Sequence, residues 1–127
     1  MKPTVILINF KNKEKLERIK NILRNEKIEA REVAKEEYAQ TIGAIAGIEE
    51  FYNKNAVYEG EELSDEMLIF AGLEDGMLDN VLASMRETGS RVNYKAVMTP
   101  YNIAWKIPDL FEELAKEHEE MTKRYGK

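Results

Sequence analysis

Short apolar runs alternate with stretches that have helical spacing, and the same order occurs twice along the chain. Residues 5–8 (Val-Ile-Leu-Ile) form an apolar run, and residues 16–23 place apolar side chains three or four positions apart. Residues 67–71 (Met-Leu-Ile-Phe-Ala) and then residues 78–85 repeat this arrangement 62 residues later. An uninterrupted apolar run of this length is typical of a strand that is buried on both faces, and the helical spacing indicates an amphipathic helix.

These patterns predict four strands and four helices. The strands are expected at residues 5–9, 28–33, 67–72 and 92–98. The helices are expected at residues 12–25, 36–52, 75–88 and from residue 108 onward, with a linker at residues 53–66. Right-handed crossovers between parallel strands place such helices against the sheet. We therefore predict an α/β fold with a single domain, in which two βαβα halves, at about residues 3–52 and 66–125, form one four-stranded sheet packed by helices.

Gly43 and Gly47 are four residues apart in the segment that is expected to form the second helix. The main interpretation is that glycine lets the backbone pack closely against the sheet, or marks a break between short helices. The alternative is a loop that binds an anion through its amides. That loop would lack the Lys-Ser/Thr ending of a P-loop and a strand directly before it, so we favour packing.

The composition excludes several kinds of site. The chain has 127 residues, no cysteine and one histidine, His118. Thiol catalysis, disulfides, iron–sulfur clusters and thiolate zinc sites all need cysteine, and a two-histidine metal site needs a second histidine. No carboxylate pair, serine motif or histidine arrangement forms a set for acid–base or nucleophilic catalysis. We therefore predict no catalytic residues, no bound metal and no cofactor.

The apolar runs are too short for targeting or membrane insertion. The run at residues 5–8 is interrupted by Asn9 and is shorter than the apolar core of a signal peptide. No run approaches the ~20 residues that a membrane span needs. We therefore expect a cytoplasmic protein that does not associate with membranes.

Charge is unevenly distributed along the chain. Residues 1–35 contain ten Lys or Arg and five Asp or Glu, for a net charge of +5, whereas residues 36–127 contain nine and nineteen, for a net charge of −10. The overall charge of −5 argues against nucleic acid as a partner, because phosphate contacts need a cationic surface. Solvated helix faces are the simplest interpretation. Patches of opposite sign also favour association between copies, so a homodimer is the alternative.

The most distinctive segment is residues 94–105, Tyr-Lys-Ala-Val-Met-Thr-Pro-Tyr-Asn-Ile-Ala-Trp. A lysine inside a strand, such as Lys95, is uncommon unless its amine meets water or a partner. Thr99, Asn102 and Trp105 follow the carboxyl end of the predicted strand, which is the edge where open α/β sheets usually bind ligands. We predict a site for a small anionic ligand or a protein partner, formed by Lys95, Thr99, Asn102 and Trp105.

A structural role is the simpler interpretation of the same residues. Thr99 and Asn102 can staple the turn through hydrogen bonds from side chain to backbone. Trp105 can cover the end of the sheet as a core residue. The two interpretations differ in what Asn102→Ala should do: a binding role predicts a folded variant that loses a ligand, and a structural role predicts lower stability.

The spacing of residues 95–105 (Lys-Ala-Val-x-Thr-x-x-Asn-x-x-Trp) resembles the signature of a small bacterial family known as domain of unknown function 3783. Residues 110–118 are similar to the terminal helix of that family, which contains Glu-His. Residues 42–48 are similar to its longer members, so the resemblance covers most of the chain. Membership implies a cytoplasmic bacterial protein and implies no particular activity.

The chain has one distinctive turn, and its sequence shows no set of residues that would converge on a catalytic site. This favours a non-enzymatic module that binds a ligand or a protein, or regulates a partner. The alternative is a small enzyme that acts on an anionic small molecule, with Lys95 as the cationic group and Asn102 as a positioning donor. A concave surface that joins Lys95 to residues 43–47 would favour the enzyme. A flat surface with Trp105 fully buried would favour the interaction module.

Overall fold

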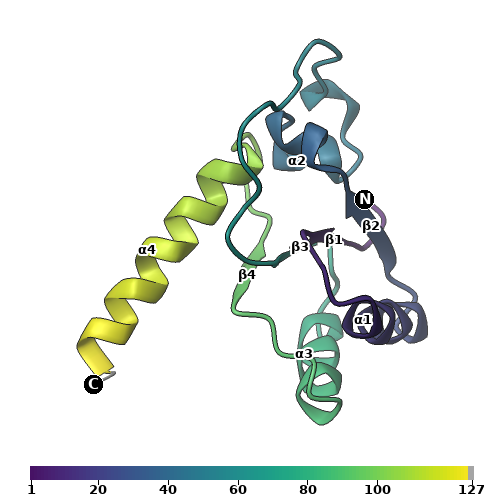
Figure 1. The fold of residues 1–127 in the computed structure, drawn as a ribbon. Coiled ribbons are helices and arrows are strands. Elements are labelled where there is room, and N and C mark those ends of the chain that lie inside the picture. The colour runs from purple at the N-terminus through teal and green to yellow at the C-terminus, as the bar shows by residue number, and fades with distance from the viewer. Residues whose placement is uncertain (126–127) are drawn as a thin grey trace.

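Four strands form one mixed sheet in the computed structural model, which describes residues 1–125 (Figure 1). The strands are β1 (Thr4–Ile8), β2 (Glu29–Val33), β3 (Met67–Ala71) and β4 (Tyr94–Val97). Their order in the sheet is β2-β1-β3-β4; the central strands β1 and β3 are antiparallel, and each outer strand is parallel to its neighbour. The predicted fold class is confirmed, because helices pack on one four-stranded sheet.

The central strands are buried on both faces. Every residue of β1 and β3 is buried, and Ile6 of β1 lies opposite Ile69 of β3 in the antiparallel register. The outer strand β2 differs, because Glu29 and Glu32 are exposed. Uninterrupted apolar runs therefore form the centre of the sheet, and the alternating run forms an edge.

Two helices, α1 (Lys13–Asn25) and α3 (Met77–Glu87), cover one face of the sheet. Ile19 of α1 and Val81 of α3 are fully buried in one apolar cluster with Leu68 of β3. The amphipathic spacing that predicts these helices therefore corresponds to the side chains that they bury.

The other face is covered by α4 (Ile107–Tyr125) and by three short helices, η1 (Lys35–Ala39), α2 (Ile42–Ile45) and η2 (Glu49–Phe51). Ile69 of β3 and Leu110 of α4 belong to the buried cluster on this face. Figure 1 shows that α4 begins beside the sheet and that its C-terminal half extends away from it. Every residue of α4 from Lys116 to Lys123 is exposed, so the first half of α4 makes the core contacts.

The prediction of one helix at residues 36–52 is wrong, because this segment forms three short helices. The hydroxyl of Thr41 accepts a hydrogen bond from the Ala44 N–H (3.2 Å), which caps the start of α2. Gly47 has a φ angle of 107°, a left-handed conformation that does not continue a helix. A break between short helices, one of the interpretations of the glycine spacing, is what the structure contains.

Gly43 allows two backbones to approach closely. A Cβ atom at Gly43 would lie 2.9 Å from Cγ1 of Ile103 and 3.1 Å from the carbonyl oxygen of Ile103. The Gly43 N–H donates to that oxygen (2.9 Å), and the Ile42 N–H donates to the carbonyl oxygen of Trp105 (2.8 Å). The start of α2 is therefore joined by backbone hydrogen bonds to the turn that precedes α4.

We expect Gly43→Ala to lower the free energy of unfolding by about 1–3 kcal/mol, because the new methyl group must displace the Ile103 backbone. Urea denaturation followed by circular dichroism measures this loss. Ala104→Ser, at an exposed position of the same turn, is the matched control and should change stability by less than about 0.5 kcal/mol. Identical midpoints for Gly43→Ala and the wild type would refute the close contact.

Each predicted half contributes one central and one outer strand, connected by α1 or α3. The segments that follow the outer strands differ, because three short helices follow β2 and one helix of 19 residues follows β4. The internal repeat and the halves at residues 3–52 and 66–125 remain predictions from the sequence.

Two features are missing from residues 1–125. No helix in this range is long and apolar enough to cross a lipid bilayer. No group of three or more His, Asp or Glu side chains in this range is placed to hold a metal ion.

Candidate functional site

Strand β4 carries Lys95, and the turn after β4 carries the other three predicted site residues. Lys95 pairs with Leu68 of β3, and Ala96 pairs with Ile69. Leu68 packs in the cluster with α1 and α3, whereas Ile69 packs in the cluster with α4. Because directly paired residues point to the same face, Lys95 faces the α3 side of the sheet and Ala96 faces the α4 side.

The side chains of Thr99 and Asn102 hold the turn after β4. Asn102 Oδ1 accepts a hydrogen bond from the Thr99 N–H (2.9 Å), and Asn102 Nδ2 donates to the carbonyl oxygen of Val97 (3.1 Å). Thr99 Oγ1 accepts from the N–H groups of Tyr101 (3.2 Å) and Asn102 (3.3 Å). Asn102 is also buried, with 9% of its surface exposed. These hydrogen bonds are the ones expected if Thr99 and Asn102 have a structural role in the turn.

Trp105 lies half-buried in the turn before α4. Its side chain packs against the apolar cluster on the α4 face. The centroid of its ring lies 5.4 Å from that of exposed Tyr101. Together with Asn102 and Ala96, Trp105 also lines a cavity of 380 Å³. Part of the indole is therefore core, and part borders an open surface.

The four predicted site residues do not form one site. Asn102 and Trp105 line a cavity on the α4 side, and Thr99 is hydrogen-bonded to Asn102 in the same turn, whereas Lys95 lies on the α3 side. The turn separates them, because β4 ends at Val97 and the residues after it no longer follow the alternation of a strand. The cavity beside Lys95 also does not include residues 43–47, so the concave surface that would favour the enzyme is absent there.

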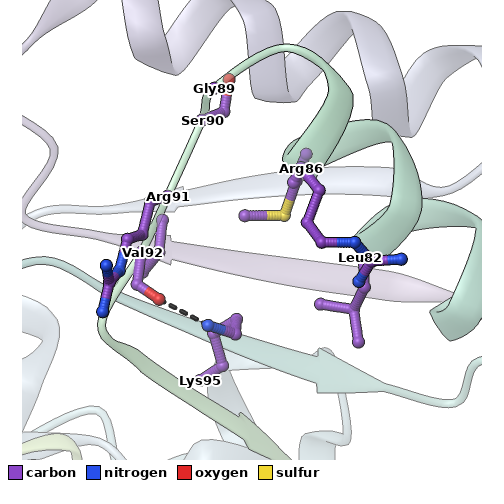
Figure 2. Close-up of a pocket in the computed structure, with 8 residues that line it drawn as sticks. Leu82, Arg86, Gly89, Ser90, Arg91, Val92 and Lys95 are labelled. Carbon is purple, nitrogen blue, oxygen red and sulfur yellow. Dashed lines mark hydrogen bonds between the residues drawn. The ribbon is translucent and has the colours of Figure 1, made fainter.

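Lys95 borders a cavity of 440 Å³ between the end of α3 and the start of β4 (Figure 2). The apolar wall of this cavity consists of Leu82 and Met85 from α3 and of Val92, which precedes β4. Met85 and Val92 are buried, and Leu82 is half-exposed. The floor of the cavity is therefore continuous with the hydrophobic core.

Three cationic side chains, Arg86, Arg91 and Lys95, line the same cavity. In Figure 2, Arg86 extends from α3 toward Leu82, and Arg91 lies on the opposite side of the view. Lys95 Nζ donates a hydrogen bond to the carbonyl oxygen of Val92 (2.5 Å). Because an ammonium group has three N–H donors, this contact leaves two donors of Lys95 for a ligand.

None of these three side chains forms an ion pair with another residue in the described part of the chain. Some cations elsewhere pair with carboxylates, such as Lys20 with Glu32 at 2.7 Å, and others, such as Lys13 and Lys54, form no ion pair in the described part of the chain. The chain contains 24 acidic and 19 basic residues, so carboxylates are in excess. What distinguishes Arg86, Arg91 and Lys95 is that they line one cavity together.

The cavity changes the protonation of Lys95. Burial lowers the pKa of Lys95 below its ordinary value of 10.5, and the positive charge of Arg91 lowers the pKa further. Both causes disfavour the charged ammonium. An anion in the cavity would oppose the second cause, because a nearby opposite charge favours the charged form.

A buried serine fixes the connection between α3 and β4. Ser90 is fully buried, and its N–H donates to the carbonyl oxygen of Met85 (2.8 Å). Its hydroxyl accepts a hydrogen bond from Nε of Arg18 in α1 (3.1 Å). Gly89 has a φ angle of 67°, as is common just past the end of a helix. This connection places Arg91 at the cavity.

Arg86 and Arg91 belong to no sequence motif, although the local charge around them is a signal. Residues 86–95 contain three cations and only one acid, Glu87, within the acidic part of the chain. A helix end followed by a strand start brings Arg86 and Lys95 to one cavity although they are nine positions apart. The signal is local charge in a turn, which a search for motifs does not detect.

Residues 66–121 match the model of a protein family described as Domain of unknown function (DUF3783). This segment belongs to the DUF3783 family. The family predicted from residues 95–105 is therefore confirmed. No curated protein and no solved structure matches the chain.

The DUF3783 segment contains the whole cavity, because the lining residues run from Leu82 to Lys95. It also contains the turn after β4 and most of α4. Residues 42–48, which are similar to longer members of the family, lie outside the match. That part of the resemblance remains a prediction.

Proposed function

We propose that the chain is a non-enzymatic binding module whose cavity between α3 and β4 takes a small organic anion. The ligand carries a carboxylate or phosphate group next to an apolar portion. One observation carries this proposal: Arg86, Arg91 and Lys95 line a largely apolar cavity and form no ion pair within residues 1–123.

The apolar wall suits one part of such a ligand. Leu82, Met85 and Val92 offer a surface on which an aromatic or alkyl group can exclude water. Burial of about 100 Å² of apolar surface contributes about 2.5 kcal/mol. The cavity volume of 440 Å³ lies within the range of roughly 300–1,000 Å³ that is usual for small-molecule sites.

The cations suit the other part of the ligand. The guanidinium groups of Arg86 and Arg91 can present paired N–H donors to carboxylate or phosphate oxygens, and Lys95 adds a compact charge. An anion would also offset the repulsion between these cations. With these contributions, and after the cost of association, we expect a dissociation constant of roughly 0.01–1 mM for a simple aromatic phosphate.

The geometry favours binding over the enzyme alternative. That alternative requires Lys95 and Asn102 to act on one small substrate. The two side chains face opposite sides of the sheet, and Asn102 already uses its amide to hold the turn. The proposal therefore does not include a reaction.

The cellular setting and the assembly are also part of the proposal. The family resemblance supports a bacterial cytoplasmic protein. The opposite net charges of residues 1–35 and 36–127 support a homodimer or a protein partner. The net charge of −5 gives no support to nucleic acid as a partner.

Isothermal titration calorimetry with phenyl phosphate tests the binding proposal. Phenol is the control for the apolar part, and inorganic phosphate is the control for the anionic part. We expect phenyl phosphate to bind at least about tenfold more tightly than either control, because only it uses both the wall and the cations. Equal affinity for phenyl phosphate and phenol would contradict a role for the cations.

Charge-neutralising variants locate the site. Arg86→Gln and Lys95→Gln should each weaken phenyl phosphate binding by about tenfold, the usual effect of losing one charged hydrogen bond. Lys54→Gln, at an exposed position of the linker, is the matched control and should bind like the wild type. Wild-type affinity in both Arg86→Gln and Lys95→Gln would place any binding elsewhere on the protein.

The lowered pKa of Lys95 predicts a pH dependence. Affinity for phenyl phosphate should fall as the pH rises through the pKa of Lys95, which lies below 10.5, because the ammonium then loses its charge. Lys95→Arg should keep its affinity to higher pH, because arginine stays protonated. Calorimetry between pH 7 and pH 10.5 measures both profiles. Identical pH profiles for the wild type and Lys95→Arg would show that Lys95 does not take part in binding.

A further inference from the structure

The turn after β4 and the first half of α4 form a second concave surface, which lies across β4 from Lys95. Two cavities of 260 and 380 Å³ share Trp105 and Glu113 in their linings. Neither of them shares a lining residue with the cavity between α3 and β4. This surface is therefore separate from the proposed anion site, and its chemistry is different.

Two aromatic rings form one wall of this surface. Tyr101 is 80% exposed, although tyrosine usually buries most of its ring. The centroids of the Tyr101 and Trp105 rings are 5.4 Å apart, and the ring planes meet at 56°. The Tyr101 N–H donates to Thr99 Oγ1 (3.2 Å), and the Trp105 N–H donates to the carbonyl oxygen of Asn102 (2.9 Å). The turn thus holds the two rings as an aromatic corner.

A row of carboxylates on α4 lines the same surface. Asp109, Glu113 and Glu117 line these cavities and are spaced four residues apart on α4. Residues with this spacing are neighbours on a helix surface, and like charges there are unfavourable. None of the three forms an ion pair in the part of the chain that the structure describes. A cation between this row and the aromatic corner would offset their repulsion.

We propose that this surface binds an organic cation, namely an ammonium group that carries alkyl substituents. The faces of Tyr101 and Trp105 attract such a group through cation–π contacts, and their apolar surface covers its methyl groups. Glu113, which lines both cavities, supplies the counter-charge. A bare metal ion fits less well, since no group of three acidic or histidine side chains within residues 1–125 is placed to coordinate it.

The fluorescence of Trp105 reports on this surface directly, because it is the only tryptophan in the chain. Choline is the first probe, and 3,3-dimethyl-1-butanol, which has the same shape without the charge, is its control. We expect a saturable fluorescence change with choline at a dissociation constant of roughly 0.1–5 mM and at least about tenfold weaker binding of the alcohol. Acetyl-trimethyllysine amide is the second probe, because a modified lysine side chain carries the same alkylated ammonium group. Whichever of the two probes binds more tightly identifies whether the ligand resembles choline or a modified lysine.

Variants on the two walls complete the test. Glu113→Gln and Tyr101→Ala should each weaken choline binding by about fivefold or more, and both sites are exposed enough for the variants to fold. Glu120→Gln, on the exposed part of α4, is the matched control and should bind choline like the wild type. The absence of a saturable change, equal binding of the alcohol, or wild-type affinity in both wall variants would overturn the proposal.

Discussion

Phe111→Ala is expected to lower the free energy of unfolding by about 3–5 kcal/mol and to loosen α4 from the sheet. Phe111 is 8% exposed and belongs to the buried cluster that joins α4 to β3. The centroid of its ring lies 4.8 Å from that of Tyr94 in β4, with the planes tilted by 56°. Because the C-terminal half of α4 is exposed, Phe111 supplies a large share of the contacts that hold this helix.

Urea denaturation measures this loss, and amide hydrogen exchange shows where it acts. We expect faster exchange in α4 of Phe111→Ala, with the amides of β1 protected until global unfolding. Met121→Ala is the matched control, because Met121 is 57% exposed on the same helix, and it should change stability by less than about 0.5 kcal/mol. A wild-type midpoint for Phe111→Ala would mean that the aromatic contact does not hold α4.

Asn102→Ala is expected to lower the free energy of unfolding by about 2–4 kcal/mol, because it leaves the Thr99 N–H and the Val97 carbonyl without their partner. The Val97 carbonyl lies at the end of β4, and the Thr99 N–H lies in the turn that connects β4 to α4. The same turn carries the backbone contact between Ile103 and Gly43. Asn102→Ala should therefore weaken the packing of α2 as well as the turn.

Two comparisons separate this structural role from a role in binding. Asn93→Ala removes an exposed side chain that donates to Asp65 Oδ2 (3.2 Å), and it should cost less than about 1 kcal/mol. At a temperature where Asn102→Ala is folded, that variant should bind phenyl phosphate like the wild type. A fully stable Asn102→Ala that has lost the ligand would restore the binding role that the sequence suggests for Asn102.

The elements with strong local signals could be predicted from the sequence. The apolar run at residues 67–71 forms the buried strand β3, and Asn12 caps α1 by accepting a hydrogen bond from the Lys15 N–H (3.1 Å). The segment at residues 36–52 could not be predicted in the same way. The packing of α2 within it involves the contact of Gly43 with Ile103, 60 positions away, and local spacing carries no record of that contact. The sheet order likewise rests on the pairing of β1 with β3.

The candidate site, too, could be predicted from the sequence only in part. The sequence leaves open whether Lys95 faces a pocket or solvent, and pairing with β3 places Lys95 and Ala96 on opposite faces of the sheet. Regular β4 ends at Val97, so the hydrogen bonds of the turn place Thr99, and strand alternation no longer does. Arg86 and Arg91 reach Lys95 only because Gly89 and Ser90 fix the path between α3 and β4. Such convergence depends on the three-dimensional path of a turn, which composition and spacing do not encode.

The most direct test of the anion site is an NMR titration of the ¹⁵N-labelled protein with phenyl phosphate. The account predicts that the largest amide shift changes fall within residues 86–95, which contain all three cations of the cavity. Shift changes should be small at Trp105 and along α4. Saturable changes centred on Trp105, or no saturable changes in residues 86–95, would contradict the proposal that this cavity binds organic anions.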